Sequence, residues 1–307
     1  MSNLKLSVLG NGAAVPTAYC NPSGQLLTFE GNQFLIDCGE GTQMQLLKHK
    51  IRYRKLENIF ISHLHGDHYY GLIGLISTFH LYGREKPLTI YAPADLEELI
   101  KHQLQVSKTT LNYELRFMHL ENYNDDPLFE SDDFYIKSFP LKHSVPCWGF
   151  VFREKPLLRK INREFIENKK IPSEQIVKIK QGSDFVDSDG VTYLNSQITI
   201  APRKSLSYAY CSDTAYDESI TKHIKDVTLL YHEATFDNSM ETVASEKLHS
   251  TASQAAQIAK NSNSLKLLLG HFSARFKDPK VLLDEARKVF PNTFLSIEGR
   301  TYLIENK

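Results

Sequence analysis

The stretch His63-Leu64-His65-Gly66-Asp67-His68 decides the fold, because four of its six side chains can bind a metal ion. It follows residues 58–61, which are apolar enough to form a buried strand that delivers the stretch to one edge of a sheet. His63 and His65 are two residues apart and face the same side of an extended chain, whereas Gly66 allows a turn that points Asp67 and His68 toward a second metal position. A polar loop with ordinary histidines is the alternative, but three histidines and one aspartate at this spacing favour a metal site.

Length and composition set limits on the rest of the molecule. The chain has 307 residues, 41% of them hydrophobic, which is enough for a core in one large domain or two smaller ones. It has no run of about 18 apolar residues, and Met1–Gly10 lacks a basic start followed by a long apolar stretch. We therefore expect a cytoplasmic protein with no membrane span and no signal peptide. The four cysteines are scattered along the chain and are expected to be free thiols.

Apolar runs and turn signals predict strands and helices in both halves of the chain. Residues 26–29 and 33–37 read as a hairpin around Gly31-Asn32. Helices are predicted at residues 41–50, 69–82, 93–106, 250–261 and 279–289. This pattern predicts an α/β protein in which helices cover sheet layers.

Three further metal-ligand candidates each follow an apolar strand. His143 comes after residues 136–141, Asp213 after residues 207–211, and His271 after residues 265–269. Strand ends that meet at one edge of a sheet place such residues together. Any one of the three alone could equally be a hydrogen-bonded structural residue, but together with the hexapeptide they favour ligation.

Coordination chemistry suggests how the seven side chains divide between two ions. The first ion would take His63, His65 and His143, the second would take Asp67, His68 and His271, and Asp213 would bridge them. Imidazole-rich ligands with carboxylates suit Zn²⁺, although Mn²⁺ and Fe²⁺ fit the same set. A pair of ions can activate water and stabilise the attacking and leaving oxygens of a phosphodiester.

The character of the sequence changes over residues 153–180. This segment holds nine Lys or Arg and four Glu, in a chain whose 36 basic and 36 acidic residues cancel overall. It contains two short helix-like pieces separated by Pro172, and we interpret it as an insertion into the core. It could be a solvated helical hairpin, or it could be an arm that grips a polyanion.

The chain resembles the ribonuclease Z family of the metallo-β-lactamase superfamily nearly from end to end. The ligand set alone is shared with glyoxalase II enzymes, so other segments carry the resemblance. The most diagnostic are His232-Glu233-Ala234-Thr235 and His249-Ser250-Thr251. The others are Asn11-Gly12-Ala13, Asp37-Cys38-Gly39-Glu40-Gly41-Thr42-Gln43, Gly66-Asp67-His68-Tyr69-Tyr70-Gly71-Leu72, Ser212-Asp213-Thr214 and His271-Phe272-Ser273-Ala274-Arg275-Phe276.

The resemblance implies a single domain over residues 1–307 with the αββα four-layer sandwich of the superfamily. Residues 153–180 fall where the family carries its tRNA-binding arm. It further implies a homodimer with two zinc ions per subunit, whose partner is precursor tRNA. The implied reaction is endonucleolytic removal of the 3′ trailer, which leaves a 3′-hydroxyl on the tRNA.

The resemblance also assigns roles to individual residues. Asp67 is implied as both metal ligand and proton acceptor; because a metal-bound carboxylate is a weak base, we expect it mainly to orient water. His249 would protonate the leaving 3′-oxygen, unless it merely begins the helix that follows. Glu233 would bond His249 and raise its pKa, or form a buried structural pair with it. Arg275 would contact the scissile phosphate or else form a surface ion pair. The cations of the arm that would bind substrate are Lys155, Arg159, Lys160, Arg163, Lys169 and Lys170.

Two segments depart from the family pattern. The early loop usually reads Pro-x-Lys-x-Arg-Asn, but here residues 16–21 are Pro-Thr-Ala-Tyr-Cys-Asn and both basic positions are lost. In the family this loop bears on cleavage-site choice and on rejection of CCA-bearing ends. The Gly-Pro motif of the arm is also missing, since residues 171–175 read Ile-Pro-Ser-Glu-Gln. Altered docking of tRNA is the hypothesis that follows.

Three other functions compete with this one. A small-molecule hydrolase, either a cyclic-nucleotide phosphodiesterase or a glyoxalase II-like thioesterase, would explain the metals but not the basic insertion. An RNA-binding protein with a relic site would be expected to lack a ligand, and none is missing. A flavodiiron oxidoreductase is disfavoured because that group has Glu where this chain has His65.

Overall fold

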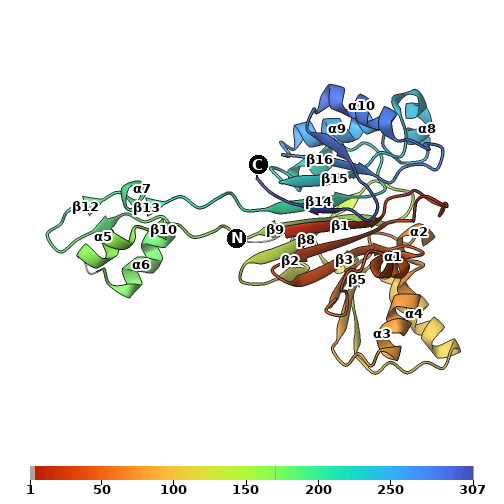
Figure 1. Cartoon of the computed structure of the whole chain (residues 1–307), viewed down its shortest axis with the longest axis horizontal. Helices are drawn as coiled ribbons and strands as arrows, with labels where there is room; N and C mark the ends of the chain where they lie inside the picture. Colours follow the sequence, from red (N-terminus) through yellow and green to blue (C-terminus); the bar gives the residue numbers. More distant parts are fainter. Residues whose placement is uncertain (1–3, 170, 307) are drawn as a thin grey trace. The chain divides into compact units, whose positions relative to one another are not determined.

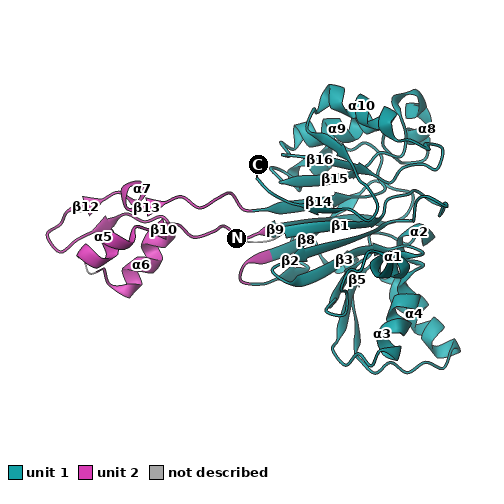
Figure 2. Ribbon diagram, in the orientation of Figure 1, with its two compact units in different colours: residues 1–131, 135–153, 206–307 teal, residues 132–134, 154–205 magenta. Residues whose placement is uncertain are grey.

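The computed structural model describes residues 4–169 and 171–306, and they form two compact units (Figure 2). Unit 1 comprises Met1–Ser131, Tyr135–Arg153 and Leu206–Lys307, and unit 2 comprises Asp132–Phe134 and Glu154–Ser205. Within the described residues, none of the helices has both the length and the apolar character that a membrane crossing requires.

The first sheet of unit 1 has seven strands in the order β18-β1-β2-β3-β4-β5-β6. In that order they are β18 (Thr301–Leu303), β1 (Leu4–Gly10), β2 (Gly24–Phe29), β3 (Asn32–Cys38), β4 (Asn58–Phe60), β5 (Leu88–Ala92) and β6 (Leu115–His119). The predicted hairpin is confirmed, because β2 and β3 pair antiparallel and Gly31 adopts the left-handed conformation, φ 87°, that the turn requires. From β3 to β6 the strands run parallel, so their carboxyl ends share one edge.

The second sheet also has seven strands, in the order β17-β16-β15-β14-β9-β8-β7. They are β17 (Thr293–Leu295), β16 (Leu267–Gly270), β15 (Leu229–Glu233), β14 (Ser207–Cys211), β9 (Cys147–Glu154), β8 (Phe134–Leu141) and β7 (Phe129–Glu130). Strands β14 to β17 pair in parallel, which places the residues after β14 and β16 at the same edge.

An aromatic layer packs between the two sheets. Because side chains alternate along a strand, Phe60 points to the opposite side from its neighbours Ile59 and Ile61, which join the outer core of the first sheet. The Phe60 ring lies 5.4 Å from that of Phe150 and 5.7 Å from that of Phe152, both on β9 of the second sheet. Rings at these separations join the two sheets edge to face.

Helices cover the outer face of each sheet, as Figure 1 shows for unit 1. The first sheet packs against α3 (Leu72–Leu81) and α4 (Asp95–Val106), and the second against α9 (Ala252–Asn261) and α10 (Lys280–Val289). Shorter helices α1 (Thr42–Lys48), α2 (Gly66–Tyr69) and α8 (Glu241–Glu246) lie in the connections. The layers are therefore helix, sheet, sheet, helix, which confirms the predicted α/β sandwich. The helix predicted at residues 69–82 corresponds to α3, which begins three residues later, and the short α2 precedes it.

Unit 2 has a small core of its own. It contains α5 (Arg163–Lys169), α6 (Ser173–Lys180), α7 (Asn195–Ile198) and two short antiparallel strand pairs, β10 (Lys160–Ile161) with β13 (Thr199–Ile200) and β11 (Phe185–Val186) with β12 (Thr192–Tyr193). Ile171 and Ile179 pack against Phe185 and Ile198. Because half of this core comes from residues beyond 180, the compact unit extends to Ser205 and exceeds the segment 153–180 marked by its basic residues.

Candidate metal centre

The structure brings the seven predicted ligand residues together in unit 1. His63, His65, His143 and Asp213 each offer a ligand atom within 4.8 Å of the others, and so do Asp67, His68 and His271. The residues come from the loop after β4 and from the segments directly after β8, β14 and β16. Parallel pairing of β14, β15 and β16 explains why Asp213 and His271 lie at one edge of the second sheet.

The first cluster consists of three imidazoles whose ring nitrogens face one another. His65 Nδ1 lies 3.1 Å from His63 Nε2 and 3.1 Å from His143 Nε2. His143 Nδ1 donates to the carbonyl oxygen of Leu248 at 3.1 Å, which leaves Nε2 without a proton and directed at the cluster. Nitrogen lone pairs that face one another repel, and a cation bound between them would remove this repulsion.

The second cluster contains two buried ring nitrogens that have no hydrogen-bond partner among the described residues, Nε2 of His68 and Nε2 of His271. The opposite nitrogen of each ring is held, His68 Nδ1 by Asp37 Oδ2 at 2.7 Å and His271 Nδ1 by Thr235 Oγ1 at 3.0 Å. A buried acceptor without a donor costs free energy, and a metal ion removes that cost. The donor set of imidazoles and carboxylates is one that Zn²⁺ accepts.

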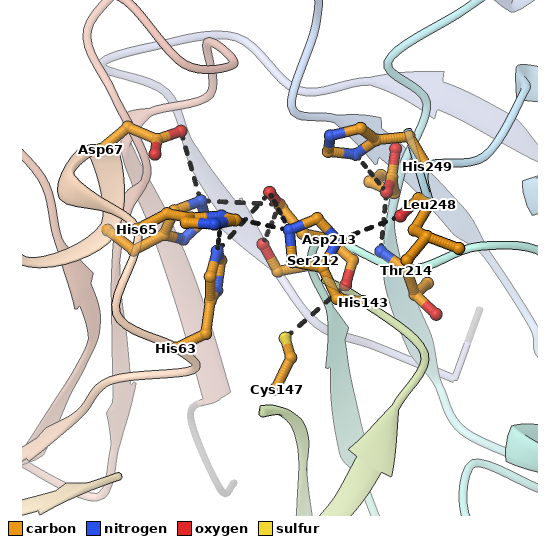
Figure 3. A network of polar contacts seen from close by, with 12 residues as sticks. His63, His65, Asp67, His143, Cys147, Ser212, Asp213, Thr214, Leu248 and His249 are labelled. Atoms are coloured by element: carbon orange, nitrogen blue, oxygen red, sulfur yellow. Dashed lines mark hydrogen bonds and ion pairs between the residues drawn. The ribbon is translucent and has the colours of Figure 1, made fainter. Parts of the chain in front are cut away.

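Asp213 lies between the two clusters and offers one oxygen to each. Its Oδ2 is 3.6 Å from His63 Nε2 and 3.8 Å from His143 Nε2, and its Oδ1 is 3.1 Å from His271 Nε2 and 3.5 Å from His68 Nε2. Figure 3 shows the rings of His63, His65 and His143 directed toward this carboxylate. Burial would raise the pKa of Asp213, but the surrounding histidines hold it well below its ordinary value.

Asp37 at the end of β3 supports the second cluster, and it was not predicted as a site residue. Its Oδ2 accepts hydrogen bonds from His68 Nδ1, from the Ser62 hydroxyl at 2.9 Å and from the Tyr210 hydroxyl at 2.6 Å. Asp37 is fully buried and adopts a left-handed backbone, φ 54°. A charged residue that ends an apolar strand was the available signal in the sequence.

Asp67 lies with the imidazoles of the second cluster. Its Oδ2 lies 3.4 Å from His68 Nε2 and 3.6 Å from His271 Nε2, and it accepts a hydrogen bond from the backbone N–H of Ala14 at 2.9 Å. Burial alone would raise the pKa of Asp67, but the neighbouring imidazoles of His271 and His68 outweigh burial and hold the pKa far below its usual range. A carboxylate with so low a pKa accepts protons poorly.

His249 and Glu233 form a pair beside the clusters. His249 Nδ1 donates to Glu233 Oε1 at 2.8 Å, and the fully buried Glu233 also accepts from the backbone N–H of Thr214 at 2.7 Å. Burial lowers the pKa of His249, but the charge and hydrogen bond of Glu233 outweigh it and raise that pKa to about 9. His249 is therefore protonated at neutral pH, with its other N–H available to the cavity.

Thr235 links this pair to the second cluster. Its hydroxyl donates to Glu233 Oε2 at 2.6 Å and, through its lone pair, accepts from His271 Nδ1 at 3.0 Å. Glu233 thus orients His249 directly and His271 through Thr235. A side-chain nitrogen of His249 also lies within 4.8 Å of ligand atoms of Asp213 and His271. These three residues form a third group of possible ligands, and the hydrogen bond to Glu233 occupies Nδ1 of His249.

An open cavity of ≈ 890 Å³ contains these groups. Two cations, Lys247 and Arg275, line it, and Lys247 had not been singled out from the sequence. Arg275 is exposed, its guanidinium contacts Met240 Sδ at 3.8 Å, and it makes no ion pair with any residue that the structure describes. The surface ion pair offered as an alternative for Arg275 is thus not found in the described part of the chain.

The early loop without basic residues lies at the rim of the same cavity, which Pro16 lines. Asn21 anchors the end of the loop, since its backbone and side-chain N–H groups both donate to the carboxylate of Glu298. Tyr19 is 94% exposed, so an aromatic ring stands near the positions where the family has cations.

The predicted substrate-binding cations of the arm differ in their surroundings. Arg163 pairs with Glu167 at 2.9 Å and Lys169 with Asp187 at 3.0 Å, so carboxylates partly neutralise both. Arg159 donates to Thr199 Oγ1 at 2.6 Å, Lys160 is exposed and Lys155 is half-buried, whereas Lys170 lies outside the described residues. Residues 154–205 hold ten Lys or Arg and seven Asp or Glu, so the unit is less basic than its first half.

Comparisons with known proteins agree with this geometry. A ribonuclease Z from Bacteroides thetaiotaomicron is 42% identical over 306 residues, which cover 100% of this chain and 97% of the relative. A ribonuclease Z from Cytophaga hutchinsonii is 40% identical, with 99% and 97% covered. The crystal structure of the short form of human tRNase Z is 27% identical with a TM-score of 0.72, and the match covers 98% of this chain and 99% of that one.

Two further matches place the chain more broadly. Residues 4–159 match the family model described as "Anti-Pycsar protein Apyc1". The metallo-β-lactamase fold protein YhfI from Bacillus subtilis shares the fold at 21% identity, with a TM-score of 0.69 over 98% of this chain and 99% of that one. The chain therefore belongs to the ribonuclease Z family of metallo-β-lactamase fold proteins, and through its first half it falls within the family of the Apyc1 model as well.

Proposed function

We propose that this protein is a zinc-dependent endoribonuclease that removes the 3′ trailer from precursor tRNA and leaves a 3′-hydroxyl on the tRNA. One observation carries the proposal: two clusters of ligand atoms share Asp213, beside a protonated histidine held by a buried glutamate. Membership in the ribonuclease Z family supports tRNA as the substrate.

Two zinc ions per subunit would be held by the two clusters. His63, His65 and His143 would hold one, Asp67, His68 and His271 the other, and Asp213 would contact both through its separate oxygens. When bound, such ions supply Lewis acidity and activate water for attack on phosphorus.

The remaining chemistry belongs to the protein's own side chains. Asp67, fixed by the N–H of Ala14, would orient the attacking water and would take up its proton only weakly, because its pKa is low. His249 would give the proton on its cavity-facing nitrogen to the leaving 3′-oxygen, since its other nitrogen is bound to Glu233. Glu233 keeps His249 protonated and so acts as a positioning residue.

Unit 2 would act as the tRNA-binding arm. Its exposed cations, Lys160 together with the partly neutralised Arg163 and Lys169, would contact backbone phosphates. Because two of the three already pair with carboxylates, we expect modest salt dependence from this arm. A homodimer in the cytoplasm completes the proposal, and sedimentation of the purified chain tests its oligomeric state.

The test is cleavage of a trailer-bearing precursor tRNA by the metal-loaded chain, with the ends of both products identified. The proposal expects a single cut that leaves a 3′-hydroxyl on the tRNA. Asp67→Ala should abolish cleavage while tRNA binding in a filter assay persists, because the side chain serves the metal and the water rather than RNA docking. Retained cleavage by this variant would contradict the assignment of Asp67.

A small-molecule phosphodiesterase or thioesterase would use the same clusters, so the substrate must be compared directly. Turnover of the precursor tRNA is measured beside that of a cyclic nucleotide and a glutathione thioester. A kcat/KM for either small molecule above that for the tRNA would replace the present proposal with this rival.

A further inference from the structure

A second, polar cavity of ≈ 250 Å³ lies in unit 1, apart from the metal centre. Lys137 of β8, Arg153 of β9, and Lys222 and His223 after β14 line it, and Asp125 is the one carboxylate that does. Lys137 is six residues before His143, and at the rise of a strand this corresponds to roughly 20 Å along β8. The cavity is therefore separate from the metal centre, with which it shares no lining residue.

The position of the cations follows from strand alternation. Phe139 on β8 and Val151 on β9 belong to the apolar core between the second sheet and its helices. Lys137 and Arg153 stand two residues from them on the same strands, so they point to the same face of the sheet. Two cations thus occupy positions where this face would otherwise continue its apolar core.

The cations are held by neutral groups rather than by carboxylates. Arg153 Nη2 donates to the carbonyl oxygens of Lys225 at 2.7 Å and of His223 at 3.4 Å, and Lys137 Nζ donates to the carbonyl oxygen of Asp125. Among the residues that the structure describes, no salt bridge is formed by Lys137, Arg153 or Lys222. The His223 ring stacks on Phe139 at 5.3 Å, so it is fixed as well.

This arrangement is electrostatically unfavourable without an anion. Arg153 is half-buried, and burial lowers the pKa of its guanidinium more than the charge of Asp226 raises it, which reflects the cost of removing a cation from water without a direct ion pair. Lys137 and Lys222 add like charges around the same small volume. Backbone carbonyl oxygens hold Arg153 and Lys137 in place without neutralising their charge. Both side chains can therefore still attract an anion.

We propose that this cavity binds a phosphate group. Planar Arg donors and lysine ammonium groups are the usual partners of phosphate oxygens. The phosphate could belong to the backbone of the RNA substrate, in which case the inference rests on the proposed function, or to a free phosphorylated small molecule.

The experiment uses the metal-loaded full chain with Lys137→Gln and Lys222→Gln combined, and Lys260→Gln on α9 as the matched control. Lys260 is exposed and does not line the cavity. Precursor tRNA affinity is measured by filter binding between about 50 and 200 mM salt. In parallel, the melting temperature is followed as inorganic phosphate or adenosine monophosphate is added, because a ligand stabilises the state that it binds.

The salt slope is the change in the logarithm of tRNA affinity with the logarithm of salt concentration. If its magnitude falls by about one in the double variant and is unchanged in the control, the RNA backbone is the ligand. Loss of the saturable stabilisation by phosphate or mononucleotide, with an unchanged salt slope, identifies a free phosphorylated molecule instead. If the double variant and the control match the wild type in both measurements, the proposal is overturned. If the double variant does not fold, Lys222→Gln, whose side chain is exposed, carries the same test. Cleavage by the wild type is scored separately, so a failure of the proposed function is distinguishable from a failure here.

Discussion

Replacing Glu233 by Gln should shift the alkaline limb of the pH–activity profile toward lower pH. The carboxylate is buried and accepts the His249 N–H at 2.8 Å, and the pKa of His249 is raised to about 9. A hydrogen bond between charged, buried partners contributes about 1.5–3 kcal/mol. At about 1.4 kcal/mol per pKa unit, the neutral amide should lower the pKa of His249 by about one to two units.

The sign follows from the role of the proton. Activity requires protonated His249, so it is complete below the pKa and is lost as the pH rises through it. With a pKa lower by about 1.5 units, the protonated fraction falls less than about two-fold at pH 7 but roughly 15-fold at pH 9. Bound metal ions would lower the pKa of His249 in the wild type and in Glu233→Gln alike. The test therefore rests on the difference between the two pKa values.

The assay is kcat/KM for precursor tRNA from pH 6 to pH 10 with the wild type, Glu233→Gln and Glu246→Gln. Glu246 also lines the cavity and is exposed, so its replacement removes the same charge without touching His249. We expect the alkaline limb of the pH–activity profile to move toward lower pH in Glu233→Gln and to stay in place in Glu246→Gln. Coincident limbs for Glu233→Gln and the wild type would show that Glu233 does not set the protonation of His249, and the reasoning would fail.

Three further outcomes are expected. Thr235→Val should lower the zinc content after dialysis, because His271 loses the acceptor that fixes its tautomer, and Thr235→Ser should restore it; equal metal content in both would contradict that role. Phe60→Ala should destabilise the fold by about 3–5 kcal/mol in urea unfolding, since the ring is fully buried between the sheets, and a loss below about 1 kcal/mol would contradict the packing. Replacing residues 155–204 by a short Gly-Ser linker should weaken tRNA binding while the metal content is kept, and unchanged affinity in a filter-binding titration would refute the arm's role.

The convergence of the ligand residues could be predicted because each one follows an apolar strand. Parallel strands bring their carboxyl ends to one edge, so Asp213 and His271 lie together although they are far apart in sequence. The hairpin at Gly31-Asn32 and the covering helices were predictable for a similar reason, since turn residues and apolar periodicity are local signals.

Other features depend on contacts that leave no local trace. Asp37 supports His68 and Thr235 supports His271 through hydrogen bonds across 31 and 36 residues. Strands β17 and β18 have three residues each, too few for a periodic pattern. The extent of unit 2 was missed because residues 181–205 contribute single core side chains such as Phe185 and Ile198 between polar residues, and a charge pattern cannot reveal them.

Anomalous diffraction at the zinc edge, from crystals of the purified chain, would locate the ions and their ligands. We expect two peaks on opposite sides of Asp213, one within bonding distance of His63, His65 and His143 and the other of Asp67, His68 and His271. A single peak, or peaks out of bonding reach of Asp213, would contradict this expectation.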